Sequence, residues 1–418
     1  MSHVLLATTP FAGHQPPLLG LARELVGDGH RVTYYTGARF GERAEAVGAT
    51  WLPWVEAKDF DDTDLAAAFP TMRTDASPAA MFSSFEQLFF GTAPGQLRDL
   101  LRLHATDPVD VVVNELTCVG GGFLHEAAGV PWASFSLSPL PLASRHLPPS
   151  GLPVRPGRGP IGRGRDAALR ALVRATLGRR FRDLINVART RAGLAPTSQL
   201  AFDSLCSPTL LLGQGVPSLE YRRPDLPGHV HLVGDTAAGT RAASGAPSWL
   251  QDLDPGRPIV HVTSGTLGLP GFDLVGAAVA ALAETPAQVV VSGDPALVPA
   301  AANVVAPGWV PHDLLLPRTA VMITNGGYGA VSSALAHGVP LVVVPGAQDK
   351  PEVARRVAWS GAGLDIGGRP SPARLRRAVE RCVGDSPQRR RAHEVAAEFH
   401  RAGGARRAAD LVTTLARP

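Results

Sequence analysis

Residues 308–350, GWVPHDLLLPRTAVMITNGGYGAVSSALAHGVPLVVVPGAQDK, decide the fold. Two short apolar runs, residues 320–324 and 341–344, are bounded by Gly or Pro and predict strands buried on both faces. Between them, residues 328–337 carry apolar side chains at helical spacing, and Gly338 followed by Pro340 predicts a helix end. The stretch therefore predicts one βαβ unit of a parallel sheet.

The turn Asn325-Gly326-Gly327 lies at the N-terminus of the predicted helix. Free backbone N–H groups and the helix dipole make such a turn suited to an anion. Glycine also lets the backbone approach a phosphate without an intervening Cβ. A tight turn that serves only the fold explains these residues equally well, because a lone glycine turn is a weak signal.

The neighbouring residues favour the anion site. Gly308-Trp309-Val310-Pro311-His312 precedes the unit, and PGAQDK at 345–350 follows it. Together they resemble the donor-binding signature of family 1 glycosyltransferases of the GT-B fold, in particular natural-product, macrolide-type enzymes of actinobacteria that use UDP- or dTDP-sugars. The resemblance extends over essentially the whole chain. In that family a Trp-Val-Pro-Gln segment stacks the nucleotide base, a His-Gly-Gly-type turn holds the diphosphate, and an Asp-Gln pair contacts the sugar.

Two series of strands alternating with helices predict two doubly wound α/β domains, and 418 residues are enough for two full cores. The resemblance implies Rossmann-like domains that face each other across a cleft. We expect an acceptor-binding domain at 1–215, a linker at 216–258, a nucleotide-sugar-binding domain at 259–400, and a C-terminal helix at 401–418 that returns toward the first domain.

Composition is that of a globular protein, with 45% hydrophobic and 18% charged residues. Cys118, Cys206 and Cys382 are isolated, so neither a disulfide framework nor a zinc site is expected. The first predicted strand starts at about residue 3, which leaves no room for a signal peptide and predicts a cytoplasmic protein.

The segment 155–191 is crowded with arginine and contains only two aspartates. A helix over about 166–192 is predicted there. The simpler interpretation is a solvated basic face, and the alternative is contact with an anionic acceptor or a membrane surface. Aromatic residues are not interleaved with these arginines, so nucleic acid is not an expected partner.

His14 is the predicted general base. It lies where the first strand gives way to a helix, at the edge where doubly wound sheets bind ligands. A neutral imidazole can take the proton of an acceptor hydroxyl near pH 7, and a helix N-terminus favours the neutral form. Glu115, at the end of another strand, could accept the second ring N–H and fix the tautomer. The family usually has Asp near the Glu115 position.

The resemblance also assigns the substrate-binding residues. Predicted donor-binding residues are Ser264, Gly265, Thr266, Trp309, Val310, Asn325, Gly326, Gly327, Gly329, Ala330, Asp349 and Lys350. Phe82, Phe85 and Phe89 are predicted to help wall the acceptor site, although core packing is the simpler explanation of these three rings.

Besides Glu115, four positions in the donor-binding stretch depart from the family pattern. Asn325 stands where His is common, Ala330 where Ser is often found, Ser333 where a ribose-binding Glu is usual, and Lys350 where Gln is usual. The backbone N–H groups of the turn remain, so diphosphate binding is still expected. Lys350 adds a positive charge near the donor that could compensate for the missing His.

The leading hypothesis is an inverting hexosyltransferase that uses a UDP- or dTDP-sugar, acts on a hydroxyl of a hydrophobic small molecule, and needs no metal or other cofactor. It is expected to be a monomer or a homodimer. A nucleotide-sugar epimerase is disfavoured by the Trp309 segment. The non-enzyme alternative is a catalytically idle GT-B protein that activates a partner enzyme, against which the pair His14 and Glu115 argues.

Overall fold

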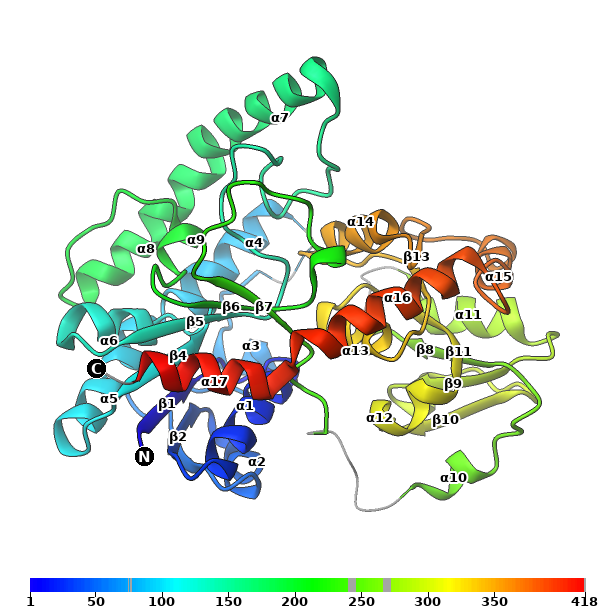
Figure 1. Cartoon of the computed structure of the whole chain (residues 1–418), viewed down its shortest axis with the longest axis horizontal. Helices are drawn as coiled ribbons and strands as arrows, with labels where there is room; N and C mark the ends of the chain where they lie inside the picture. The colour runs from blue at the N-terminus through cyan, green and yellow to red at the C-terminus, as the bar shows by residue number, and fades with distance from the viewer. Residues whose placement is uncertain (74, 76, 240–245, 266–271, 417–418) are drawn as a thin grey trace.

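The computed structural model describes residues 1–73, 75, 77–239, 246–265 and 272–416. Within these ranges the strands form two parallel sheets, one of seven strands and one of six (Figure 1). The first sheet has the order β3-β2-β1-β4-β5-β6-β7, and the second has the order β10-β9-β8-β11-β12-β13. Both orders reverse direction beside the first strand of the series, as in a doubly wound fold.

The first sheet comprises β1 (His3–Ala7), β2 (Arg31–Thr36), β3 (Thr50–Pro53), β4 (Val111–Glu115), β5 (Trp132–Ser136), β6 (Leu211–Gln214) and β7 (Val230–Gly234). The second comprises β8 (Ile259–Thr263), β9 (Gln288–Ser292), β10 (Val304–Gly308), β11 (Thr319–Thr324), β12 (Leu341–Val343) and β13 (Gly363–Asp365). Every pairing between neighbouring strands of both sheets is parallel.

The central strands are apolar on both faces because helices cover both. On β1, Leu5 and Ala7 enter one hydrophobic core, whereas Val4 and Leu6 enter the core on the other face. This alternation follows from the two-residue period of a strand. An almost continuous apolar run is the expected result for a parallel strand buried on both sides.

Helices connect these strands and cover both sheets. They are α1 (Gln15–Gly27), α2 (Gly41–Ala46), α3 (Leu65–Ala68), α4 (Pro78–Ser84), α5 (Ala93–Thr106), α6 (Gly120–Ala128), α7 (Gly159–Val173), α8 (Arg179–Arg191), α9 (Ala201–Ser204), α10 (Ser248–Gln251), α11 (Leu274–Leu282), α12 (His312–Leu315), α13 (Tyr328–Ala336), α14 (Lys350–Ser360), α15 (Pro372–Glu380), α16 (Pro387–Ala402) and α17 (Gly404–Leu415).

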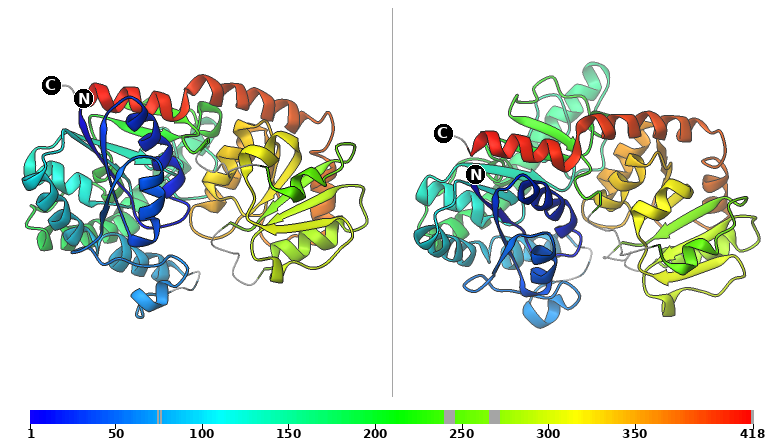
Figure 2. Two further views of the ribbon diagram at one scale, coloured as in Figure 1. Left: turned by 90° about the horizontal axis from the view of Figure 1, so that it is seen from below. Right: turned by 60° about the horizontal axis from the view of Figure 1, so that its bottom comes forward.

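The last two helices join the two halves of the chain. α16 packs beside α13 of the second half, and α17 packs beside α1 of the first. Ala408, Ala409 and Val412 of α17 are completely buried in the core of the first sheet. In both views of Figure 2 the α16–α17 pair runs along one side of the molecule and spans both sheets.

Two segments differ from the sequence-based expectation. The expected linker 216–258 contains β7, which pairs with β6 and forms an edge of the first sheet. This strand is only five residues long and is flanked by Pro and Gly, so its apolar residues were not recognised. The helix expected at 166–192 starts earlier, with α7 at Gly159, and a π-helical turn at Arg174–Gly178 joins it to α8.

The two halves approach closely at the carboxyl ends of their strands. Gly215, directly after β6, has a φ of +122°, and a Cβ added there would lie 2.3 Å from the hydroxyl oxygen of Tyr328 at the start of α13. Only glycine permits this approach, because an L side chain would have to overlap the phenol.

Candidate active site

The candidate catalytic pair lies where two neighbouring strands of the first sheet end. His14 follows β1 and directly precedes α1, and Glu115 is the last residue of β4, which pairs with β1. The structure brings the two side chains together: Nδ1 of His14 is 3.3 Å from Oε1 of Glu115. The His14 side chain is 26% exposed and the Glu115 side chain only 2% exposed.

Four groups hold the Glu115 carboxylate. Its Oε1 accepts hydrogen bonds from the backbone N–H of Thr9 at 3.1 Å and from the hydroxyl of Thr117, and its Oε2 accepts from the N–H of Thr117 at 2.9 Å. Burial opposes ionisation, but the charge and hydrogen bond of His14 and the bonds of Thr117 outweigh it and lower the pKa of Glu115 to about 2. Glu115 is therefore a carboxylate at neutral pH and can only accept.

This geometry determines the tautomer of His14. Because the carboxylate can only accept, Nδ1 of His14 donates, and Nε2 of the neutral ring carries the lone pair. Nε2 is then the atom available to a substrate hydroxyl. Thr117, which the sequence did not single out, helps the longer glutamate fill a position where the family usually has aspartate.

An aromatic side chain that the sequence pattern does not single out lies next to His14. The ring centroid of Phe11 is 5.1 Å from that of His14 and 6.1 Å from that of Phe89. Phe89 is therefore connected to the His14 loop through Phe11. The partial burial of Phe89 is hard to predict from the sequence, because the segment before α5 has no clear periodicity.

Of the other two predicted acceptor residues, Phe82 is buried, whereas Phe85 is partly buried, as Phe89 is. Phe82 is 3% exposed, its ring is 4.7 Å from that of Phe181, and the Arg180 guanidinium lies 3.9 Å above it. Phe85 packs in the same cluster, 4.8 Å from Phe181. The structure does not bring Phe82 to His14, so its predicted acceptor role has no geometric support.

The predicted diphosphate turn lies between β11 and α13. Tyr328, Gly329 and Ala330 form the first turn of α13, and their N–H groups have no acceptor within the helix. The positive end of the helix dipole lies at the same place. Gly326 has a φ of +89°, which a glycine adopts without strain.

Asn325 has a structural role in this turn. Its side-chain N–H donates to the carbonyl oxygen of Ser264, and its Oδ1 accepts from the N–H of Gly327 at 3.2 Å. The N–H of Gly326 donates to the hydroxyl of Thr324 at 3.2 Å. The amides of both glycines are thus engaged within the turn, and the first-turn amides of α13 are the better candidates for the diphosphate.

The side chain of Asn325 therefore connects two donor loops, the one after β8 and the one after β11. Gly265 in the first loop has a φ of +68°, and Ser264 is partly buried. Thr266 lies outside the described residues. Ser333, at the position where the family has a ribose-binding Glu, is 1% exposed and therefore lies inside α13's packed face.

Trp309 presents a broad apolar surface at the predicted base site. Its side chain is 54% exposed, whereas Val310 beside it is 5% exposed and packs in a hydrophobic cluster with Leu250 and Ile259. The buried valine anchors the segment and the indole projects from it. A large exposed aromatic ring next to a buried anchor is suited to stacking on a planar base.

A pair of histidines, His261 and His312, connects this segment to the second sheet. His261 on β8 is completely buried; its Nδ1 donates to the carbonyl oxygen of Val290 at 3.0 Å, and its Nε2 is 3.3 Å from Nε2 of His312. Burial lowers the pKa of His261 to about 4, so it is neutral and its Nε2 accepts from His312. The bond ties the Trp309 loop to the sheet.

The last donor loop carries Asp349 and Lys350 at the start of α14. Lys350 is 8% exposed, and burial lowers its pKa, while the Asp349 carboxylate acts in the opposite direction. Burial raises the pKa of Asp349, and the positive charge of Lys350 counteracts this. Gln348, just before, has a φ of +64°.

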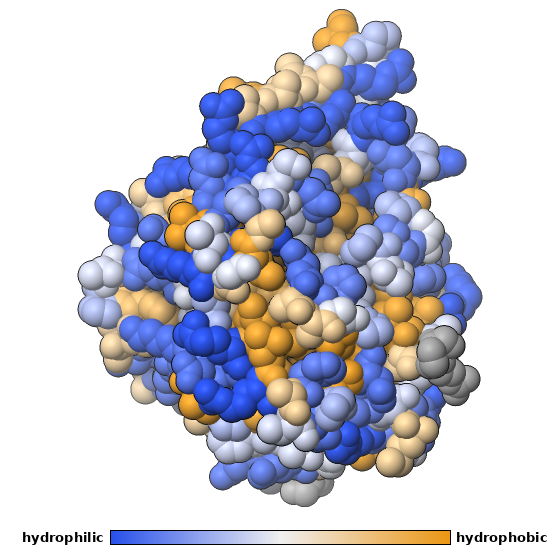
Figure 3. All heavy atoms as spheres, turned by 90° about the vertical axis from the view of Figure 1, so that its left-hand side faces the viewer, coloured by the Kyte–Doolittle hydropathy of each residue, from blue (hydrophilic) through white to orange (hydrophobic). Residues whose placement is uncertain are grey.

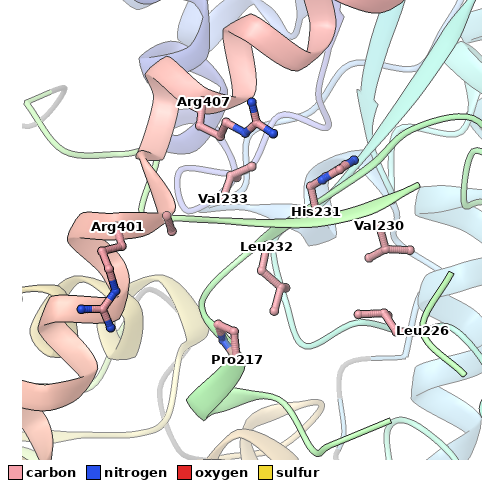
Figure 4. A pocket seen from close by; sticks show the side chains of 9 residues that line it. Pro217, Leu226, Val230, His231, Leu232, Val233, Arg401 and Arg407 are labelled. Carbon is pink, nitrogen blue, oxygen red and sulfur yellow. The ribbon is translucent and has the colours of Figure 1, made fainter. Parts of the chain in front are cut away.

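A pocket of about 390 Å³ lies elsewhere, between the edge strand β7 and the junction of α16 and α17 (Figure 4). Its lining residues are Pro217, Leu226, Val230, His231, Leu232, Val233, Arg401, Ala402 and Arg407. None of the predicted catalytic or substrate-binding residues belongs to it.

Comparisons with known proteins identify the family of the chain. Residues 277–405 match the family model for the C-terminal domain of erythromycin biosynthesis protein CIII-like proteins. The chain is 40% identical over 391 residues to 4'-demethylrebeccamycin synthase of Lentzea aerocolonigenes, which covers 93% of each protein. It is 28% identical over 436 residues to demethyllactenocin mycarosyltransferase of Streptomyces fradiae, which covers 100% of this chain and 87% of that protein.

Solved structures confirm the predicted fold. The glycotransferase of kitacinnamycin superposes with a TM-score of 0.74 at 24% identity, covering 99% of this chain and 98% of that one. The glycosyltransferase VinC, solved in complex with dTDP, superposes with a TM-score of 0.70 at 23% identity, covering 99% of both chains. With the 40% identity to the synthase over nearly the whole length, these matches establish that the chain belongs to the natural-product glycosyltransferases of the GT-B fold.

Proposed function

We propose that the protein is an inverting glycosyltransferase that moves a hexose from a UDP- or dTDP-sugar to a hydroxyl of a hydrophobic small molecule. The observation that carries the mechanism is the contact of 3.3 Å between Nδ1 of His14 and the Glu115 carboxylate. It fixes the tautomer of the neutral ring that carries the lone pair on Nε2, and it orients that ring, as a general base requires.

The reaction is a single displacement. Nε2 of His14 takes the proton of the acceptor hydroxyl while the hydroxyl oxygen forms a bond to the anomeric carbon of the sugar. The bond from that carbon to the diphosphate oxygen breaks, and its electron pair leaves with the nucleoside diphosphate. Attack from the face opposite the leaving group inverts the anomeric configuration. The imidazolium that forms is stabilised by the Glu115 carboxylate.

The second domain supplies groups suited to the leaving diphosphate. The first-turn amides of α13 have no acceptor within the helix and are suited to bind an anion, and the helix dipole adds a partial positive charge. Lys350 contributes a full positive charge on the neighbouring loop. Together these groups would stabilise the charge that develops on the leaving oxygen.

The names of the relatives suggest donor and acceptor classes for this chain. The mycarosyltransferase and 4'-demethylrebeccamycin synthase are named for natural-product substrates, and VinC binds dTDP. We extend these classes to this chain: a dTDP- or UDP-sugar as donor and a natural-product aglycone as acceptor. The idle-auxiliary alternative gains no support, because the His14–Glu115 contact has no use in a protein without catalysis.

A thermal-shift panel tests the donor class. We expect UDP or dTDP to raise the midpoint of thermal unfolding and GDP to leave it unchanged, because a ligand that binds only the folded state stabilises it. The matching NDP-glucose should then be consumed with a phenolic acceptor, and the proton coupling of the product should show an inverted anomeric centre. A product with retained configuration would refute the proposed displacement.

Trp309→Ala should weaken the binding of UDP or dTDP by about 1–3 kcal/mol, the range for losing a base–aromatic stack. The ring is exposed, so its removal leaves no cavity in the fold. Isothermal titration measures the effect. Trp359→Ala, at a 37% exposed tryptophan of α14, is the control and should leave nucleotide affinity unchanged. Unaltered affinity in a folded Trp309 variant would assign the ring to packing.

Lys350→Gln should weaken donor binding by about ten-fold, although it restores the common family residue. A unit charge about 5 Å from a phosphate is worth up to about 3 kcal/mol at an effective dielectric constant near 20, and part of this is offset by hydration. The loss should grow at low ionic strength. Lys58→Gln, at the other lysine of the chain, is the matched control. Equal donor affinity of the wild type and Lys350→Gln at every salt concentration would exclude a charge contribution.

A further inference from the structure

The arginine-rich segment of the sequence forms an arm that extends away from both sheets. We define the arginine arm as residues 155–180, which comprise α7, the π-helical turn and the residues that flank them. Figure 1 shows α7 at the top of the molecule, beyond the helices that cover the first sheet. Asp166 is the only buried residue in α7, and none of the π-helical turn is buried.

The arm is strongly basic. It contains Arg155, Arg158, Arg163, Arg165, Arg170, Arg174, Arg179 and Arg180. With one aspartate, the arm has a net charge of +7, whereas the whole chain has +4, so the rest of the protein is net acidic. A basic surface that attracts an anionic partner is therefore confined to this part of the molecule.

Few contacts within the chain neutralise this charge. Arg165 pairs with Asp166 at 2.7 Å, and Arg170 donates to the carbonyl oxygen of Leu147. In the ranges that the structure describes, the side chains of Arg158, Arg163 and Arg174 make neither a hydrogen bond nor an ion pair. Arg170 and Arg174 lie four residues apart on one helix, where like charges are destabilising.

The helix itself gains little stability from its own sequence. Gly162 and Gly164 lie inside α7, and each costs about 1 kcal/mol relative to alanine in a helix. Ile161 is 91% exposed and Leu172 is 59% exposed, so neither contributes buried apolar area. A helix of this kind would be stabilised by an external surface that neutralises its arginines and covers its apolar side chains.

The pattern around the helix indicates which surface fits. At about 100° per residue, Ile161 and Leu172 share one side of α7, and Arg165 lies beside them. Arg163, Arg170 and Arg174 lie on the opposite side of the helix. Figure 3 shows hydrophilic side chains crowded along the arm, with an apolar group at its tip. An apolar side opposite a basic side is the pattern of a helix that lies in the headgroup region of an anionic bilayer.

We propose that the arginine arm docks the enzyme on an anionic lipid surface, with Ile161 and Leu172 in the interface and the arginines of the arm at the level of the phosphate headgroups. This inference rests in part on the proposed function, because a hydrophobic acceptor partitions into lipid. Docking is peripheral: among the helices in the described ranges, none is both long and apolar enough to cross a bilayer. The arm is not expected to bind a second copy of itself, because two arms of the same positive charge would repel each other.

Vesicle co-sedimentation of the full chain tests the proposal. Vesicles with one third phosphatidylglycerol should pull down the wild type at low salt, vesicles of pure phosphatidylcholine should not, and binding should fall steeply with added NaCl. The variant Arg158→Gln, Arg163→Gln, Arg174→Gln should bind roughly a hundred-fold more weakly, since each arginine near an anionic bilayer contributes about five-fold.

The matched control is Arg374→Gln, Arg377→Gln, Arg381→Gln, which removes the same charge from exposed positions on and directly after α15. It should bind within about three-fold of the wild type. Three results with vesicles would each overturn the proposal: equal losses of vesicle binding in the two triple variants, equal binding of the wild type to neutral and anionic vesicles, or no binding to anionic vesicles. Binding of the wild type to immobilised polyglutamate but not to anionic vesicles would also overturn it. Both triple variants should retain wild-type turnover of a water-soluble acceptor without vesicles, which separates this inference from the proposed catalysis.

Discussion

Replacing His14 by alanine is expected to lower the turnover number by about two to four orders of magnitude, the range for losing a general base. The reason is specific to the geometry: Nε2 of His14 is the one basic atom that the Glu115 contact prepares to accept a proton. Nucleotide affinity should not change, because the diphosphate site is built on the other sheet. Initial rates at saturating donor and titration with UDP or dTDP measure the two quantities.

The control for this variant is His400→Ala, which removes an exposed imidazole of α16. It should retain wild-type turnover. If His14→Ala turned over a hydroxyl acceptor within a few-fold of the wild type, another group would have to take the proton. A parallel loss of nucleotide affinity would instead point to a misfolded first domain.

Glu115→Gln should reduce turnover less, by roughly ten- to a hundred-fold, since the imidazole that takes the proton remains. The pH dependence distinguishes this variant from simple damage. Because the folded-state pKa of about 2 lies below the ordinary glutamate value of 4.5, the Glu115 charge stabilises the fold above pH 4.5, and this contribution is lost as the pH falls from 4.5 toward 2. The variant should lack that part of the acid destabilisation in unfolding experiments between pH 5 and pH 3.

The sequence predicted the fold where local patterns are strong. The apolar runs that became β1, β11 and β12 were recognisable, because parallel strands buried on both faces have few polar residues. The sequence did not predict strands that depend on contacts with distant parts of the chain. The five-residue strand β7 forms through its backbone pairing with β6. The early start of α7 was missed because Gly159, Pro160, Gly162 and Gly164 have low helix propensity.

For the site, strand order alone put His14 and Glu115 at one edge, since β1 and β4 are neighbours in the sheet. No pattern in the sequence could show that Thr117 and the amide of Thr9 hold the glutamate. The departure at Asn325 was noticed, but its bridge to the Ser264 carbonyl spans 61 residues and only the folded chain reveals it. Side-chain contacts between residues far apart in the sequence determine the geometry of the site, but they leave no recognisable pattern in the neighbouring sequence.

The same limit applies to a buried ion cluster behind the donor loop. Arg356 of α14 is 2% exposed and donates to Glu220 at 2.7 Å and to Glu352 at 2.7 Å. Glu220 also accepts from the N–H of Leu140, and Glu352 accepts from the N–H of Gly151. The cluster therefore connects the loop after β5, the segment after β6, and the helix that begins with Lys350.

Arg356→Leu should lower the free energy of unfolding by about 3–5 kcal/mol, because it leaves two buried carboxylates without their counter-charge. Arg356→Lys should restore little of this stability, since lysine cannot donate to both carboxylates in the geometry of a guanidinium.

Arg406→Leu is the control. Arg406 pairs with Asp28 and Asp410 on the surface and is 50% exposed, so its substitution should lower the free energy of unfolding by no more than about 1 kcal/mol. Urea unfolding monitored by circular dichroism measures both. Similar losses in the two variants would show that burial adds nothing to the cluster. Weaker dTDP or UDP binding by Arg356→Leu than by Arg406→Leu, below the unfolding transition, would show that the cluster also positions the start of α14.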